Sequence, residues 1–267
     1  MGILNITPDS FSDGGKYFSV DTAVSHGIKL IKNGADIIDI GGESSRPFAE
    51  SVLPEQEMER VIPVIEKLSS QSDIIISIDT TKAEVAKEAI NAGASIINDI
   101  SALEKDPSMA KIAAEMNVPV ILMHMKGTPQ TMQIDPDYDN LMHEITNYLK
   151  QRALYAIKTG IKKDNIILDP GIGFGKTVKH NLLLIKHLKK IISIGFPVLI
   201  GPSKKSFIQK TLSAGTSREI KFDSQENKNG TLAAVAVCVM NGAHIIRVHD
   251  VKCIKPLIQI ITAIQNS

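Results

Sequence analysis

The sequence predicts an α/β protein, and within that class a (β/α)8 barrel of the TIM type that forms one domain over residues 1–267. A chain of 267 residues fits one α/β barrel better than a sandwich or a small bundle. Short apolar runs typical of buried strands alternate with helical segments along the chain. A Gly-Ala pair followed by an apolar run recurs at Gly34, Gly93 and Gly242, as a helix end followed by a strand start.

Eight apolar runs are candidate strands, and each precedes a helical segment. They are 2–6, 36–40, 74–79, 95–100, 119–125, 165–169, 197–201 and 244–249. Apolar residues with helical spacing occur at Val24, Ile28 and Ile31, at Leu141, Ile145 and Leu149, and at Ile254, Leu257, Ile258 and Ile261. We interpret the long connections 7–20, 41–54 and 126–138 as lid or binding loops at the carboxyl face of the strands, with disordered excursions as the alternative. The connection 213–227 is also polar.

Composition excludes several classes of protein. Hydrophobic residues make up 43% of the chain, and no apolar run reaches eighteen residues, so we expect a cytoplasmic protein without a membrane span. The net charge of +1 comes from 30 basic and 29 acidic residues spread along the chain, which argues against a nucleic-acid or membrane surface. Cys238 and Cys253 lack C-x-x-C spacing, and we expect plain buried thiols.

Polar residues collect where the predicted strands end. They are Asn5, Asp39, Asp79, Asn98, Asp99, His124, Asp169, Ser203, Lys204, Lys205, Ser206, Arg247, His249 and Asp250. In a barrel the carboxyl ends of all strands meet at one face, where the chemistry of such folds is found. The sequence therefore predicts a site at this face.

The sequence changes most sharply at Asp169, where a buried run ends on a carboxylate and enters a glycine loop. Glycines at 171, 173 and 175 allow backbone N–H groups to approach a ligand, and Phe174 adds an aromatic face. The loop is not a phosphate loop, because Pro170 stands where G-x-x-x-x-G-K-[ST] needs glycine, and the spacing also fails G-x-G-x-x-G.

Asp79 and Asn98 close two further apolar strands. Either residue alone is equally well explained as a helix cap. Together with Asp169, they match the N–H-rich edge of a heterocycle. A metal site or an acid–base pair is the alternative for the carboxylates, although no histidine joins them at metal-ligand spacing.

Basic residues follow the last two strands. Lys204-Lys205 is explained either as a solvated pair or as part of a site, because serines flank it. Arg247 and His249 alternate and so point to the same side, which suits a bound anion. Barrels commonly hold phosphate at the ends of these two strands.

Five segments resemble, in order, the signatures of the dihydropteroate synthase family. They are MGILNITPDSFSDGG (1–15), DIGGESSRP (39–47), LDPGIGFGK (168–176), GPSKKS (201–206) and RVHD (247–250). The resemblance covers nearly the whole chain. It implies a barrel enzyme that joins 6-hydroxymethyl-7,8-dihydropterin pyrophosphate to p-aminobenzoate, giving 7,8-dihydropteroate and pyrophosphate for folate synthesis.

The resemblance also implies roles for individual residues. Asp79, Asn98, Asp169 and Lys205 would hold the pterin, Asn5 would ligate Mg²⁺, and Arg247 with His249 would hold the pyrophosphate. Two loops would close over the reacting centre with Thr7, Pro8, Phe11, Ser45, Arg46 and Pro47. Phe174, Lys205 and Ser206 would flank p-aminobenzoate. We also assign Met123, Gly201 and Ser203 to substrate binding, and we expect Asn5, Arg46, Lys205, Arg247 and His249 to act in catalysis.

Some positions depart from the family pattern. Ser45 stands where threonine is usual, Phe48 where glycine is usual, and Lys204 where arginine is common. The chain begins within the first signature, so we expect a truncated first strand.

Two other functions fit the same resemblance: a pterin-binding methyltransferase module, and a non-catalytic pterin-binding protein. The loop with Arg46 argues against the first, and the joint presence of Asn5, Arg46, Arg247 and His249 argues against the second. We expect a homodimer through the apolar helix 231–238, although packing of that helix on the barrel explains it equally well.

Overall fold

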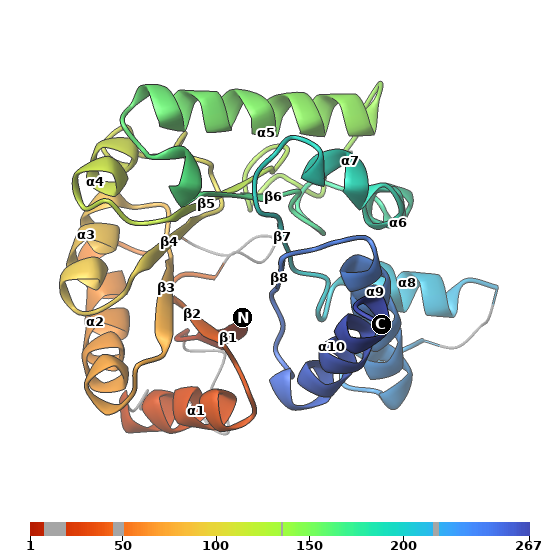
Figure 1. Ribbon diagram of the computed structural model, residues 1–267, viewed down its shortest axis with the longest axis horizontal. Helices are drawn as coiled ribbons and strands as arrows, with labels where there is room; N and C mark the ends of the chain where they lie inside the picture. Colours follow the sequence, from red (N-terminus) through yellow and green to blue (C-terminus); the bar gives the residue numbers. More distant parts are fainter. Residues whose placement is uncertain (8–19, 45–50, 135, 216–218) are drawn as a thin grey trace.

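The computed structural model describes residues 1–267 except 8–19, 45–50, 135 and 216–218. Within this part of the chain, eight parallel strands follow one another around an axis, and helices form a layer outside them (Figure 1). The strands are β1 (Gly2–Asn5), β2 (Ile37–Gly41), β3 (Ile75–Asp79), β4 (Ile96–Asp99), β5 (Val120–Met123), β6 (Ile166–Asp169), β7 (Leu199–Ile200) and β8 (Ile245–Ile246). All eight predicted strands are confirmed, with shorter bounds for the last two.

The barrel consists of two sheets joined at two seams. Strands β1 to β6 form one sheet in chain order, and β7 pairs with β8 in a second sheet. Single bridges join the sheets, from Leu168 on β6 to Val198 before β7, and from Gly2 on β1 to Val248 after β8. At the first seam Leu168 N donates to Pro197 O at 2.9 Å, and at the second Ile3 N donates to Val248 O at 3.0 Å. These bonds close the predicted barrel.

The outer layer contains the predicted helices. They are α1 (Val20–Lys32), α2 (Pro54–Gln71), α3 (Ala83–Asn91), α4 (Met109–Glu115), α5 (Leu141–Lys158), α6 (Val178–Lys186), α7 (Leu188–Ile192), α8 (Ser206–Ser213), α9 (Gln225–Met240) and α10 (Val251–Gln265), and a short 3-10 helix covers Lys163–Asn165. The Gly-Ala pairs end helices as predicted, because Gly34, Gly93 and Gly242 have φ of 94°, 119° and 91°. This left-handed region favours glycine.

Among the described residues three apolar clusters form the interior, and the smallest, Met123, Met132 and Phe174, lies beside the glycine loop. The largest one lies between the strands and the helices. The second one, which we call the barrel floor, takes one residue from or beside seven strands: Met1, Ile37, Ile96, Ile121, Ile167, Leu199 and Ile245. Because side chains alternate along a strand, the residues two positions later face the same interior. That next level, at the carboxyl ends, is the barrel mouth, and it contains Asp39, Asn98, Asp169 and Arg247.

Candidate active site

Arg247 links two strands of the opposite sheet in the barrel mouth. Its Nε donates to Asp39 Oδ2 at 2.6 Å, and its Nη2 donates to Asp79 Oδ2 at 2.8 Å. Asn98 Nδ2 donates to the same Asp39 oxygen at 3.1 Å. The other Asp39 oxygen is buried and has no hydrogen-bond partner among the described residues. Asp39 is therefore the residue to which the predicted site residues Asn98 and Arg247 both attach.

Burial governs the charge of Asp79. It raises the pKa of the Asp79 carboxyl to about 7, against the opposing effect of the Arg247 guanidinium, and the Asp39 carboxylate adds to the rise. The two carboxylates in turn raise the pKa of Arg247, although burial alone would lower it. A carboxyl that titrates near neutral pH beside a fixed cation accepts hydrogen bonds from a ligand, and perturbed groups of this kind cluster at functional sites.

Asp169 sits at the end of β6 and shapes the glycine loop that follows. Its Oδ1 accepts a hydrogen bond from Gly171 N at 2.7 Å. Gly171 has a φ of 70°, and a Cβ there would lie 2.0 Å from the His124 carbonyl oxygen, so only glycine fits. Burial raises the pKa of the Asp169 carboxyl to about 6, although the Gly171 N–H and the Lys205 ammonium oppose the rise.

The two adjacent lysines have different environments. Lys204 is exposed and pairs with Asp223 at 3.3 Å. Lys205 is half-buried, and its ammonium lies 4.1 Å from the centroid of the Phe174 ring. Burial and then the nearby Arg247 lower the pKa of Lys205 to about 8. The solvated interpretation of the pair is confirmed for Lys204 and wrong for Lys205.

His249 and Ser203 join the ends of the last two strands. Ser203 Oγ lies 3.1 Å from His249 Nδ1, and His249 N donates to the same oxygen at 3.3 Å. Ser203 is buried and His249 is half-buried. The structure thus brings these two predicted residues into direct contact.

Lys176 is a buried lysine to which the sequence pattern assigns no role. Its Nζ lies 3.0 Å from His124 Nδ1 and donates to the Phe174 carbonyl oxygen at 2.8 Å. Burial lowers the pKa of Lys176 to about 7, and burial together with Lys176 lowers that of His124 to about 2. A neutral imidazole here accepts a hydrogen bond from the ammonium, which fixes the glycine loop against the end of β5. In the sequence, the one indication of this role is that a lysine directly follows Phe174-Gly175 in a loop that is otherwise apolar.

The other predicted residues lie at or near the same face. Asn5 and Gly201 are half-buried, Thr7 and Met123 are buried, and Ser206 is exposed at the start of α8. Pro8, Phe11, Ser45, Arg46 and Pro47 lie outside the described residues, as does Phe48.

The helix-cap interpretation of Asp79 and Asn98 is wrong. The N-cap of α3 is Lys82, and the Ala83 N–H in its first turn donates to Asp106 Oδ2 at 2.8 Å. The N-cap of α4 is Ser108. Neither helix therefore uses the predicted acid or amide.

The remaining findings concern the two cysteines, metal-binding clusters and membrane spans. Cys238 is buried as expected, but Cys253 is exposed, because it lies in the first turn of α10, which begins at Val251. Within the described residues no group of three histidine, cysteine, aspartate or glutamate side chains is arranged to hold a metal ion. No helix in this part of the chain combines the length and apolar character that a membrane span needs.

A cavity of about 340 Å³ opens beside Asp79 at the carboxyl ends of β3 to β5. Ile100 and Met125 give it an apolar wall, and Thr80 and Tyr148 add hydroxyl groups. Asp79 lines this cavity and also bonds to Arg247, so a flat polar ring bound there would lie beside a cation that can hold a negatively charged group.

Comparison with known proteins gives consistent results. The family model described as pterin binding enzyme matches residues 1–249. Dihydropteroate synthase of Synechocystis sp. is 45% identical, over 99% of this chain and 89% of that protein. The Yersinia pestis dihydropteroate synthase structure with a sulfonamide drug has a TM-score of 0.92 and 41% identity, over 100% of this chain and 94% of that chain. The Xanthomonas albilineans dihydropteroate synthase in complex with 7,8-dihydropteroate has a TM-score of 0.86 and 38% identity, over 100% and 93%.

Proposed function

The chain belongs to the family of pterin-binding enzymes, and we propose that it catalyses the dihydropteroate synthase reaction. It joins 6-hydroxymethyl-7,8-dihydropterin pyrophosphate to p-aminobenzoate and releases pyrophosphate. The observation that carries the proposal is the barrel mouth itself, where Asp79, Asn98 and Asp169 lie on one sheet and Arg247, from the other side, bonds to Asp79 and to the Asp39 carboxylate that also holds Asn98. The Xanthomonas albilineans relative holds the product of this reaction, 7,8-dihydropteroate.

We assign the pterin ring to the carboxylates and the amide of the mouth. The ring presents N–H groups along its amidine edge, which Asp169 and Asp79 accept, while Lys205 donates to a ring acceptor. Arg247 is held beside this position by Asp39, 2.6 Å from its Nε, so its guanidinium lies over the ring and near the leaving group. The Phe174 ring and the Lys205 ammonium, 4.1 Å apart, flank p-aminobenzoate.

We assign the departing pyrophosphate to Arg247 and His249, with Ser203 fixing the imidazole. A guanidinium fork and an imidazole stabilise the negative charge that develops on this group. The neutral aryl amine attacks the pterin methylene, its nitrogen forming the new C–N bond as the C–O bond to pyrophosphate breaks, and the proton that the nitrogen then loses passes to the released pyrophosphate or to water. Because the nucleophile is neutral and pyrophosphate leaves by itself, no strong general base is needed.

Asn5 is the residue that we expect to hold Mg²⁺. It lies half-buried at the carboxyl end of β1, at the face where the other site residues lie. Magnesium in sites for phosphate compounds uses few protein oxygens and completes its shell with substrate oxygens and water, so one amide oxygen fits. When bound, the ion would neutralise charge on the pyrophosphate.

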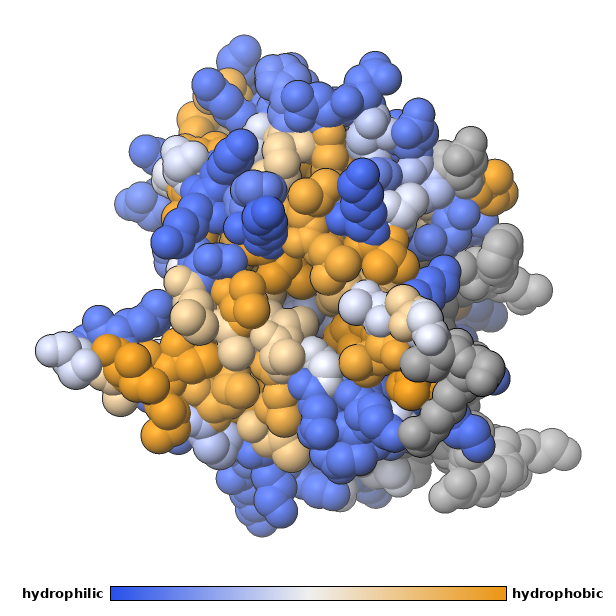
Figure 2. Space-filling model, turned by 90° about the vertical axis from the view of Figure 1, so that its right-hand side faces the viewer, coloured by the Kyte–Doolittle hydropathy of each residue, from blue (hydrophilic) through white to orange (hydrophobic). Residues whose placement is uncertain are grey.

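A second copy of the chain is the partner that we expect. Figure 2 shows apolar side chains gathered on the face that lies at the right of Figure 1, where α6, α8 and α9 are found. A groove there is lined by Leu182, Ile185, Phe207, Ile208, Leu212, Ala233, Ala234 and Val237. Exposed apolar patches of this kind mark interfaces, and helix 231–238 lies within α9 as predicted. The homodimer and the cytoplasm remain predictions.

The proposal is tested by pyrophosphate release in the presence of the pterin pyrophosphate, with and without p-aminobenzoate and Mg²⁺. We expect release that depends on both additions and matches the dihydropteroate formed. A protein that binds pterin but releases no pyrophosphate would favour the non-catalytic or methyltransferase alternatives instead.

A further inference from the structure

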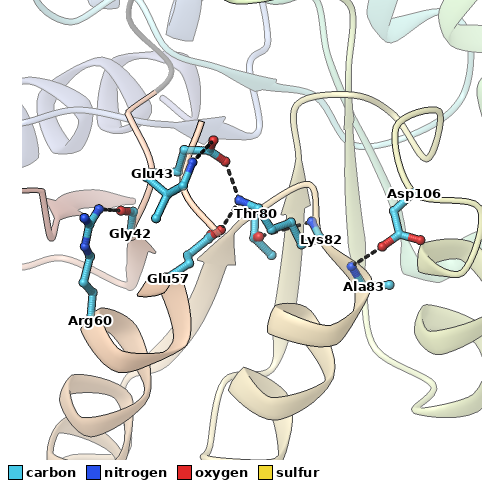
Figure 3. Close-up of polar contacts among 9 residues, drawn as sticks. Gly42, Glu43, Glu57, Arg60, Thr80, Lys82, Ala83 and Asp106 are labelled. Carbon is cyan, nitrogen blue, oxygen red and sulfur yellow. Dashed lines mark hydrogen bonds and ion pairs between the residues drawn. The ribbon is translucent and has the colours of Figure 1, made fainter. Parts of the chain in front are cut away.

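A buried ion-pair network lies beside the barrel mouth, with one carboxylate, Glu43, at the edge of the cavity next to Asp79 and its other two members behind it. Lys82, in the β3–α3 connection, donates to Glu43 Oε2 at 2.6 Å and to Glu57 Oε2 in the first turn of α2 (Figure 3). The side chains of Lys82, Glu43 and Glu57 are 15%, 19% and 0% exposed. We call these three residues the Lys82 network.

Arg60 and the Lys82 network together fix the two ends of the segment that connects β2 to α2. Where the segment leaves β2, Arg60 Nη1 donates to the Gly42 carbonyl oxygen at 2.7 Å. Where it returns, Val52 N donates to Glu43 Oε1 at 3.1 Å. The N-cap of α2, Leu53, has no side-chain cap. The Glu43 carboxylate, held in turn by Lys82, therefore replaces a local cap as the tie at this junction.

Lys82 is itself placed by the connections that follow β3 and β4. Its N–H donates to Thr80 Oγ1 at 3.2 Å, and the next N–H, of Ala83, donates to Asp106 Oδ2 at 2.8 Å (Figure 3). Lys82 lies three residues after Asp79, which contacts Arg247 in the mouth. The Lys82 ammonium therefore connects the β2–α2 segment, which it contacts through Glu43, with the end of the strand that carries Asp79.

Stability alone does not account for this arrangement. Glu57 is fully buried, and its Oε1 has no hydrogen-bond partner among the described residues. A buried carboxylate with an unpaired oxygen costs free energy, and apolar residues of similar volume commonly replace such ion pairs without loss of stability. Two carboxylates around one ammonium are better explained by a role in fixing the position of the β2–α2 segment.

The charge of the Lys82 ammonium does not depend on pH near neutrality. Burial alone would lower the pKa of Lys82, but its hydrogen bonds to Glu43 and Glu57 raise it above the ordinary lysine value. The ammonium consequently stays charged wherever the mouth residues titrate.

We propose that Lys82 is a positioning residue for the p-aminobenzoate half of the reaction. Through Glu43 and Val52 it sets the two ends of the segment that contains Arg46, relative to Asp79, while Lys82 itself lies outside the lining of the cavity. The inference rests on the proposed function, in which Arg46 acts on the reacting centre.

The test uses the double variant Lys82→Met with Glu57→Leu. The single change Lys82→Met would leave Glu57 buried and unpaired and can fail to fold, whereas the double variant removes both buried charges and frees Glu43. Lys67→Met is the matched control, because Lys67 makes an exposed ion pair with Asp21 at 2.7 Å on the outer layer. Steady-state kinetics with each substrate, calorimetric titration with a pterin, and the thermal midpoint are measured for all three proteins.

We expect the double variant to keep its thermal midpoint and its pterin affinity, while kcat/KM for p-aminobenzoate falls about 10- to 100-fold, as small misplacements of reacting groups do. Lys67→Met should match the parent. If kcat/KM for p-aminobenzoate in the double variant equals that of the parent, the network has only a structural role and the proposal is wrong. An equal loss of pterin affinity would also overturn the proposal, since the network would then act on the barrel mouth rather than on the segment.

Hydrogen exchange of the Val52 amide gives a readout that does not depend on activity. We expect faster exchange in the double variant than in Lys67→Met, because Glu43 loses the partner that fixes it. Unchanged exchange would overturn the proposal. If the parent itself released no pyrophosphate, the proposed function would fail, while this measurement would still decide whether Lys82 fixes the segment ends.

Discussion

In the barrel floor lie Ile37, Ile96 and Ile167, and two residues later on the same strands Asp39, Asn98 and Asp169 lie in the barrel mouth. Both sets face the barrel axis, and all six residues are buried except Ile37, which is half-buried. The floor is apolar throughout, whereas the mouth contains carboxylates whose pKa values are raised by burial and a lysine whose pKa is lowered by it. The comparison teaches that this barrel gives up stability at one level of its interior in order to bind a polar ligand there.

The largest expected effect follows from removing the cation that holds the mouth together. Arg247→Met leaves Asp39 and Asp79 buried without the guanidinium that bonds to both, so the free energy of unfolding should fall by about 3–5 kcal/mol. Arg152→Met on α5 is the matched control, because Arg152 bonds to the Ala102 carbonyl and to the half-exposed Glu104. Denaturant unfolding at pH 7.5 measures both variants. Equal losses would mean that Arg247 makes no special contribution to the mouth.

The next effect concerns ligand binding at Asp169. Asp169→Asn keeps an oxygen for the Gly171 N–H but presents an N–H donor to one side of the pterin edge. Pterin affinity should therefore fall by about 2–4 kcal/mol, or roughly 30- to 1,000-fold. Calorimetric titration with a pterin measures the loss, and circular dichroism checks the fold. A folded variant with unchanged affinity would remove Asp169 from the pterin site.

The same variant should be more stable than the parent, which sharpens the contrast with the floor. The pKa of Asp169 is raised to about 6 in the folded protein, so the folded state binds more protons than the unfolded state between about pH 4 and 6. The contribution of this group to stability therefore falls as pH rises through that window, and it stays low above it. Asp169→Asn should exceed the parent by about 1–3 kcal/mol above pH 7. A difference that does not grow between pH 4 and 6.5 would contradict the burial effect.

The smallest effect is expected in the floor. Ile121→Val removes one methylene from a fully buried side chain and should lower the free energy of unfolding by about 0.5–1.5 kcal/mol. Because the floor makes no contact with substrate, kcat/KM should stay within about two-fold of the parent. Thermal unfolding and steady-state kinetics check both statements. A large kinetic loss without a matching loss of stability would show that the two levels are not separable.

The fold could be predicted because its pattern is local. Alternating isoleucines such as those of β2 and β3, and the Gly-Ala helix ends, depend on neighbours within a few residues. The bounds of β7 and β8 were less accurate, since Val198 and Val248 pair across the seams rather than within a sheet. The seam bridges depend on how the barrel closes, and a short stretch of sequence contains no information about that closure.

The site could be predicted only in part for the same reason. The ends of the strands identified Asp79, Asn98, Asp169 and Arg247 as candidates. Asp39 was noted at a strand end but not assigned to the site, because its partner Arg247 lies 208 residues away. The Lys82 network was missed entirely, since its members come from two different connections and a helix, and each resembles a solvated charge in the sequence.

The two seams of the barrel have a consequence for its dynamics. Asp39, Asp79, Asn98 and Asp169 belong to the six-stranded sheet, while Arg247 directly follows the two-stranded one. A ligand held by both sides is therefore a noncovalent crosslink between two cooperative units that single bridges otherwise join. Local opening in proteins concentrates where backbone hydrogen bonds are fewest. The amide protons of Ile3 and Leu168, which cross the seams, should consequently report whether the mouth is occupied, from positions that touch no substrate.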